Sequence, residues 1–222
     1  DFGALAVKDV TASISDMGEV AARLGSIVTY DKRGDVVDFD NFEEPILKWE
    51  VNPFVDAYGR LDSTHAKSGS QSMKLHTANR ANAKVEIHRS FAILKAKKLG
   101  IEISFSLSNR NCDLWFYFWY NSGERAYDAR LKFDPNSKKL YVWDEVGADW
   151  VEVADTWGVT VSGYFFHTIK LVVDFDNALY KRLLFDNEEY DISSRTVYNY
   201  ESVVFPIHCP PKQQDRPSQL RR

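Results

Sequence analysis

The sequence predicts an all-β fold, a two-sheet antiparallel β-sandwich. Aromatic residues make up 14% of the 222 residues and there are only 2 methionines, a balance that favours strands because flat and β-branched side chains pack well on a pleated sheet. Short segments of alternating apolar and polar residues recur along the chain. Clusters of Asp, Asn, Gly, Ser and Pro separate them, with no helical spacers between. About ten short strands punctuated in this way are typical of a sandwich.

Residues 1–25 differ in pattern from the rest of the chain and are predicted to form an amino-terminal arm with a short helix. Asp16 is the expected first cap, Glu19 lies three residues later as a capping box requires, and Gly25 is the expected stop. The apolar side chains share one face at helical spacing: Met17, Val20, Ala21 and Leu24. A helix this short is marginal alone, so this face is expected to dock on the protein's own sandwich or on a neighbouring subunit.

The sandwich domain is predicted over residues 26–204. It begins with a hairpin of 27–30 and 36–39 around the turn 31–34. The strand 101–107 shows the clearest alternation of apolar and polar residues. The other expected strands are 70–75, 83–88, 114–120, 127–133, 140–143, 150–153, 165–173 and 180–185.

Residues 205–222 are rich in proline and are predicted to form an extended, basic tail. Its net charge is +3, because four cations, Lys212, Arg216, Arg221 and Arg222, outnumber one acid. Such a segment cannot bury enough apolar surface to order itself. We therefore expect both ends of the chain to contact other protein subunits, with Met17, Val20, Leu24, Arg216, Arg221 and Arg222 as the docking residues.

Charge and hydropathy narrow the classes of partner. The net charge of −4 gives no basic footprint for DNA or RNA, so no nucleic-acid partner is expected. No run of 18 apolar residues occurs, so no membrane span is expected. The two cysteines, Cys112 and Cys209, are too few for a disulfide framework, and the sequence leaves open whether they pair.

The segment 114–120 is the most unusual because both of its faces are aromatic or apolar. One face carries Leu114, Phe116, Phe118 and Tyr120 and is expected to line the core. The other carries Trp115, Tyr117 and Trp119. Flat rings can stack on the C–H faces of sugars while their polar tips bond hydroxyl groups, so this face is a candidate glycan or partner platform. The alternative, which the sequence favours, is a central strand covered on both sides.

Two further tryptophans, Trp143 and Trp150, stand next to turns, where a loop can present an aromatic ring to a ligand. We add them to the candidate stacking residues. Packing at the rim of the sandwich is the competing interpretation for each.

No catalytic residues are expected. Hydrolysis of a glycoside needs two carboxylates facing each other across a cleft, and the Glu-x-Asp-x-x-Glu arrangement of sandwich glycosidases does not occur. The nearest acidic pairs resemble turns or solvated edges: Glu43 with Glu44, Glu86 with His88, and Asp174 with Asp176. The histidines lack metal-ligand spacing, and His167, on the apolar face of its strand, is expected to be a satisfied core residue.

A structural calcium ion is a minor hypothesis. Asp38, Asp40 and Glu43 supply hard oxygen ligands near an expected strand end. Acids that cap a turn in water are the favoured alternative. No other cofactor is expected.

Three stretches carry family resemblances. Residues 38–43 with Trp49 and 68–75 resemble the opening of carbohydrate-binding jelly-roll modules, and 172–182 resembles the late hairpin of laminin-G and concanavalin-like sandwiches. The leader 21–35 resembles segments ahead of such sandwiches in phage-associated virion proteins. These resemblances imply a jelly roll, glycan contact and a place in a virus particle.

Taken together, the sequence predicts a structural or binding module of a larger assembly and not an enzyme. A capsid decoration or tail accessory protein of a virion, with glycan contact, is the first expectation, and a virion or extracellular location is favoured. A free-standing carbohydrate-binding module associated with polysaccharide degradation is the alternative. A jelly-roll glycoside hydrolase or lyase is a distant third.

Overall fold

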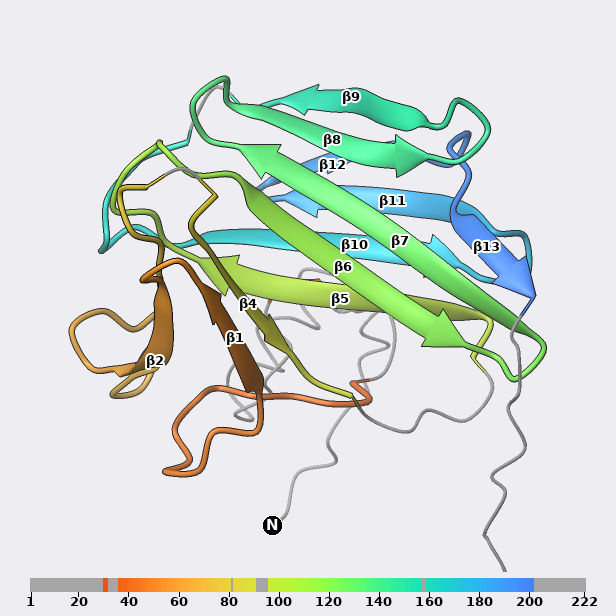
Figure 1. Cartoon of the computed structure of the whole chain (residues 1–222). Coiled ribbons are helices and arrows are strands. Elements are labelled where there is room, and N and C mark those ends of the chain that lie inside the picture. Colours follow the sequence, from red (N-terminus) through yellow and green to blue (C-terminus); the bar gives the residue numbers. More distant parts are fainter. Residues whose placement is uncertain (1–29, 32–35, 81, 91–95, 157–158, 202–222) are drawn as a thin grey trace, which may run out of the picture.

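The computed structural model describes residues 30–31, 36–80, 82–90, 96–156 and 159–201. This part of the chain folds into thirteen strands, β1 to β13, and contains no helix. All the strand pairings in it are antiparallel. Figure 1 shows that two larger sheets lie one in front of the other, with the smaller strand pairs at one side.

The first large sheet has four strands in the order β12-β11-β10-β5. Its strands are β5 (Lys98–Phe105), β10 (His167–Asp174), β11 (Leu179–Phe185) and β12 (Glu188–Tyr190). The central strand β10 is buried along most of its length. Its apolar side chains Ile169, Leu171 and Val173 point into the core.

The second large sheet has five strands organised around β7. Its strands are β6 (Leu114–Asn121), β7 (Arg125–Asp134), β8 (Lys139–Asp144), β9 (Asp149–Asp155) and β13 (Tyr198–Glu201). One edge of β7 pairs with β6 over nearly its whole length. The other edge pairs with β13 at its beginning and with β8 at its end.

Two small ribbons complete the described structure. They are β1 (Glu50–Phe54) with β4 (Lys84–His88), and β2 (Tyr58–Asp62) with β3 (Ser72–His76). Both lie beside the large sheets at the lower left of Figure 1.

The core fills the space between the two large sheets. Phe133 of β7 is fully buried, and its ring centroid lies 6.0 Å from that of Phe105 and 5.5 Å from that of Phe185, both in the facing sheet. Leu131, Val142 and other inward side chains of the second sheet join the same cluster. Two antiparallel sheets that share one core are compatible with a β-sandwich.

Two hairpins show why the predicted turn residues end their strands. Asp134 accepts a hydrogen bond from the backbone N–H of Asn136 at 2.9 Å, and Asp174 accepts one from that of Asn177 at 3.3 Å. In each turn a later residue, Lys138 or Ala178, has a positive φ. Short acidic side chains that bond the turn backbone are what favours Asp at these positions.

The expected strands from 70–75 onward all lie on observed strands, with shifts of a few residues at their ends. The hairpin at 27–39 is not supported, because residues 36–39 are described without strand structure and 27–29 lie outside the described residues. The amino-terminal helix and the tail from residue 202 also lie outside them.

Four strands were not predicted: β1, β2, β12 and β13. Pro53 interrupts β1 and Gly59 interrupts β2, and both residues weaken a strand pattern. The structure gives Gly59 a reason, because a Cβ there would lie 2.7 Å from Val51 and 2.9 Å from Met73. Close packing of the two ribbons therefore requires glycine where the sequence suggested a loop.

Two further expectations concern membrane-spanning helices and the two cysteines. In the residues described, no helix is long and apolar enough to cross a bilayer. Cys112 is partly buried against the core, and burial raises the pKa of its thiol. Its suggested partner, Cys209, lies outside the described residues.

Candidate functional site

Strand β6 turns a row of three aromatic side chains to the outside. Leu114, Phe116 and Phe118 pack against the core, so the alternation of the strand directs Trp115, Tyr117 and Trp119 outward. Their exposed fractions are 46%, 54% and 71%. Of the two arrangements that the sequence left open, the described structure shows the exposed one.

The row continues across the sheet onto β8 and β9. Trp143 and Trp150 lie opposite each other in the pairing of these strands, and their ring centroids are 5.7 Å apart. Trp150 also contacts Trp115 edge to face at 5.0 Å. We call this surface the aromatic face and define it by six rings: Trp115, Tyr117, Trp119, Tyr141, Trp143 and Trp150.

Two cations of β7 stand between the rings. Arg130 is paired in register with Tyr117, and Lys132 with Trp115. The guanidinium of Arg130 lies 5.5 Å from the ring centroid of Trp143. The ammonium of Lys132 is 4.5 Å from the ring of Tyr141, 5.6 Å from Trp150 and 5.8 Å from Trp115. Cation–π attraction at these distances holds both side chains close to the face.

The two cations differ in their charge partners. Arg130 donates two hydrogen bonds to Oδ2 of Asp128, at 2.8 and 2.6 Å. Asp128 is buried, and its Oδ1 has no hydrogen-bond partner among the described residues. The charge of Arg130 is therefore neutralised by its ion pair with Asp128. Lys132 has no ion pair in the part of the chain that the structure describes; its close neighbours are the three rings. Among the described residues, the face therefore offers one positive charge without an ion-pair partner.

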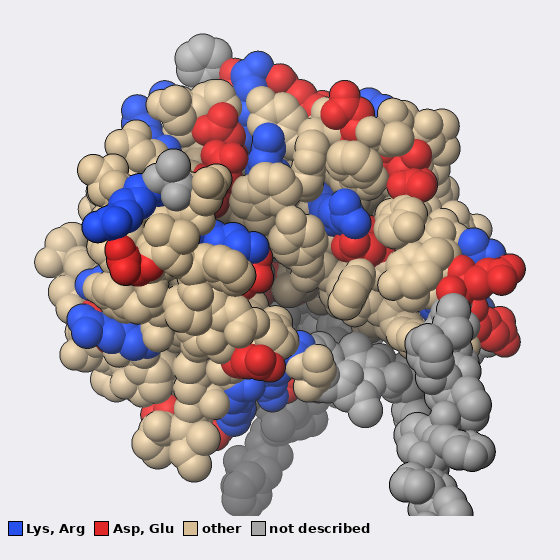
Figure 2. Space-filling model, viewed as in Figure 1, with Lys and Arg blue, Asp and Glu red and all other residues tan. Residues whose placement is uncertain are grey.

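Tyr117 supplies a polar group in the middle of the row. Partial burial raises the pKa of its phenol above the usual range, while the charge of Arg130 acts in the opposite direction. The hydroxyl is consequently neutral near pH 7 and available as a hydrogen-bond donor or acceptor. Figure 2 looks onto this side of the molecule and shows basic side chains standing among uncharged ones over the sheet that contains β6, β7 and β8.

The candidate calcium ligands do not converge on one point. Asp38 and Asp40 both face Arg89, at 3.0 and 3.5 Å. Glu43 instead accepts hydrogen bonds from the Ser70 hydroxyl and from the backbone N–H groups of Gln71 and Ser70. These bonds lower the pKa of Glu43, and the bond from the Ser70 hydroxyl contributes most. No group of three acidic, histidine or cysteine side chains suited to a metal ion occurs in the described residues. The calcium site stays a prediction without structural support.

The acidic pairs weighed for catalysis are held in other contacts. Glu86 pairs with Lys84 at 3.0 Å, and His88 pairs with Glu50 at 2.8 Å across the β1–β4 ribbon. Asp174 bonds the backbone of its own turn. The prediction for His167 is confirmed, because its ring is fully buried and its Nδ1 lies 2.6 Å from Oδ2 of Asp186.

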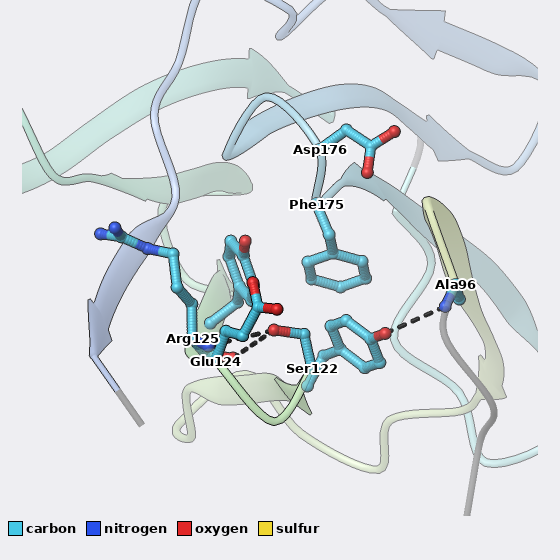
Figure 3. A pocket seen from close by; sticks show the side chains of 8 residues that line it. Ala96, Ser122, Glu124, Arg125, Phe175 and Asp176 are labelled. Atoms are coloured by element: carbon cyan, nitrogen blue, oxygen red, sulfur yellow. Dashed lines mark hydrogen bonds between the residues drawn. The ribbon is translucent and has the colours of Figure 1, made fainter. Parts of the chain in front are cut away.

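A pocket of about 160 Å³ opens near the β6–β7 turn (Figure 3). Its aromatic wall consists of Tyr120, Tyr127 and Phe175, whose rings pack on one another, and the hydroxyl of Tyr120 accepts a hydrogen bond from the backbone N–H of Ala96. The guanidinium of Arg125 is directed away from the pocket and bonds Asn199. With its polar groups engaged in this way, the pocket is a less complete site than the aromatic face.

Sequence reasoning identified five rings of the face as candidate residues but missed its two cations. The signal for them was present in β7, where Arg130 and Lys132 alternate with the apolar residues Ala129, Leu131 and Phe133. The predicted docking residues of the two ends, Met17, Val20, Leu24, Arg216, Arg221 and Arg222, lie outside the described residues.

Comparisons with protein families, with curated proteins and with solved structures found no match to this chain. The resemblances to carbohydrate-binding, laminin-G-like and virion proteins thus have no family evidence behind them. What the structure supports is the coarser statement of an all-β protein built from antiparallel sheets.

Proposed function

We propose that this chain is a non-catalytic β-sandwich module that binds polysaccharide through the aromatic face. The observation that carries the proposal is the row on β6, in which the rings of Trp115 and Tyr117 are stacked within 20° of parallel and 6.2 Å apart. Trp119 extends the row and has no ring partner among the described side chains. Alternate residues of a strand are about 7 Å apart, so the row is long enough to contact more than one sugar ring.

Physical chemistry supports a ligand on this surface. Large exposed aromatic surfaces mark interaction sites, because a folded protein gains stability by burying such rings. Sugars suit this surface since their C–H faces pack on flat rings, while the Trp N–H groups and the Tyr117 hydroxyl can bond sugar hydroxyls. A jelly-roll or concanavalin-like topology, as the sequence resemblances imply, belongs to the same proposal.

The non-catalytic part of the proposal is supported by the contacts of the acids. The candidate pairs lie in ion pairs or turns. Asp128, which is opposite Trp119 of the aromatic face in the β6–β7 register, is buried and bound to Arg130. The role in a virus particle rests on sequence features of residues 1–25 and 205–222, and nothing in the described residues adds to it.

The test is affinity gel electrophoresis of the full chain in gels that contain a panel of neutral and acidic polysaccharides. We expect at least one polymer to retard the protein, and Trp119→Ala to weaken that binding by roughly tenfold or more, as for an aromatic hot-spot contact. The matched control is Tyr164→Ala, which removes an exposed ring, 80% accessible, from a loop away from the face. No retardation by any polymer, or equal loss in both variants, would overturn the proposal.

A further inference from the structure

The charge arrangement on the aromatic face points to the class of polysaccharide, and this inference rests on the proposed function. We infer that the ligand is an acidic polysaccharide whose sugar carboxylates, as in a uronic acid polymer, bind the ammonium of Lys132. Three features of Lys132 support this ligand: its position, its missing counter-ion and the charges around it.

Lys132 is placed where a bound sugar would meet it. It is opposite Trp115 in the β6–β7 register and lies over the rings of Trp150 and Tyr141. A sugar stacked on Trp115 would therefore bring its ring substituents next to the ammonium. Rings hold the lysine by cation–π attraction but leave its N–H donors without acceptors.

Lys132 also lacks an ion-pair partner among the described residues. A positive group of this kind normally lies against a carboxylate, as Arg130 does against Asp128 and Lys139 does against Glu152. For Lys132 no carboxylate lies within ion-pair distance in the described part of the chain. An anionic substituent of the ligand is the partner that complements this charge.

The surroundings of Lys132 favour a sparsely charged polymer over a densely sulfated one. Sulfated glycans are bound by clusters of several Lys and Arg residues, whereas this face, among the residues described, has a single free cation. Asp113 and Asp134 also interact electrostatically with Lys132, so a second nearby anion on the ligand would be repelled. One carboxylate for each sugar unit fits this pattern.

The experiment measures the dissociation constants of the full chain for polygalacturonate and alginate, each against its methyl ester, at low ionic strength. Esterification removes the charge and keeps the sugar ring. The protein is expected to bind at least one acidic polymer about tenfold more tightly than its ester, as for one charge-assisted hydrogen bond, and salt should reduce the difference.

Three variants test whether Lys132 causes the preference for the acidic polymer over its ester. Lys132→Met should bring the ratio of acid to ester binding close to one while binding of the ester persists, and Lys132→Arg should retain the preference. Lys181→Met, which removes an exposed lysine of β11 in the other sheet, should behave as the parent protein. A preference that survives in Lys132→Met, or that Lys181→Met loses equally, overturns the inference.

The remaining outcomes separate this inference from the function on which it rests. Tighter binding to heparin than to both acidic polymers would overturn the assignment to carboxylates. Equal binding to acid and ester, with Trp119→Ala still weakening it, would overturn the acidic ligand and leave polysaccharide binding in place. Binding to no polymer would overturn both.

Discussion

The outer faces of the two large sheets differ in how their side chains are satisfied. On the sheet of β5, β10 and β11, the protein's own polar groups cover the face: Lys67 donates to Ser104 and Thr168, at 2.7 and 2.9 Å. Asp31, which is buried, pairs there with Lys170 at 3.1 Å and Arg182 at 2.9 Å. The aromatic face on the opposite sheet has no such cover among the described residues. This contrast supports the proposal that the aromatic face is a ligand surface.

Among substitutions on the two outer faces, the largest effect is expected on the polar face. Asp31→Asn removes the carboxylate between Lys170 and Arg182 and deprives two poorly exposed cations of their shared partner, so the free energy of unfolding should fall by roughly 3 kcal/mol. Urea unfolding measures it. Asp155→Asn, at an exposed position of β9, is the control and should stay within about 0.5 kcal/mol of the parent. Equal losses in the two variants would contradict the role given to Asp31.

A smaller effect should separate the two cations of the aromatic face. Arg130→Met would leave Asp128 buried without its cation, at a cost of about 2 kcal/mol because the pair is partly exposed. Lys132→Met loses only its cation–π attraction to the rings, worth about 0.5–1 kcal/mol in total at a partly exposed site. Thermal unfolding of the two variants should therefore rank Arg130→Met as the less stable. The reverse order would mean that Lys132 has a structural role and would weaken its assignment to a ligand.

Lowering the pH should reduce the free energy of unfolding, because carboxylates with lowered pKa values become protonated. Burial acts to raise the pKa of Asp144, but hydrogen bonds from Thr196 and the charge of Arg195 outweigh it and lower the pKa, and Asp174 is similar. Hydrogen bonds from Thr64 lower the pKa of Asp62 to about 2. Because the unfolded chain then binds more protons in acid, these groups stabilise the fold fully above about pH 4 and progressively less toward pH 2. Urea midpoints that are flat from pH 4 to pH 2 would contradict this.

The smallest stability effect is expected at the most exposed ring of the row. Trp119→Ala should change the free energy of unfolding by no more than about 0.5 kcal/mol, since a surface side chain without ring contacts adds little to the core. Phe133→Ala, in contrast, removes a fully buried ring and should cost about 3–5 kcal/mol. A melting loss in Trp119→Ala comparable with that of Phe133→Ala would show that Trp119 is a packing residue.

The parts of the fold that were predicted are those with local signals. Alternation located β5 through β11 except for their exact ends, and turns of Asp, Asn, Pro and Ser such as 134–137 separated them. Strand β12 was not predicted because it is only three residues long. Strand β13 is also short, and it pairs with a distant segment, as Tyr198 does with Asp128. The pattern of residues within one strand does not show which distant strand it pairs with.

The candidate site shows the same division. The ring types on β6 predicted a platform, and the alternation predicted which rings share a face, but whether that face is open depends on the packing of the whole molecule. Lys132 could be placed beside Trp150 only once the order β6-β7-β8-β9 was known. The sequence pattern of a single segment does not show which side chains of neighbouring strands lie beside it.

The central claim, that the aromatic face is open and is the ligand surface, is tested most directly by hydroxyl-radical footprinting of the full chain, read by mass spectrometry. We predict heavy oxidation of Trp115, Tyr117 and Trp119 in the free protein. Saturating amounts of a polysaccharide that retards the chain should protect these three rings and leave Tyr164 unchanged. Rings on β6 that resist oxidation without ligand, or that oxidise equally with and without it, would contradict the claim.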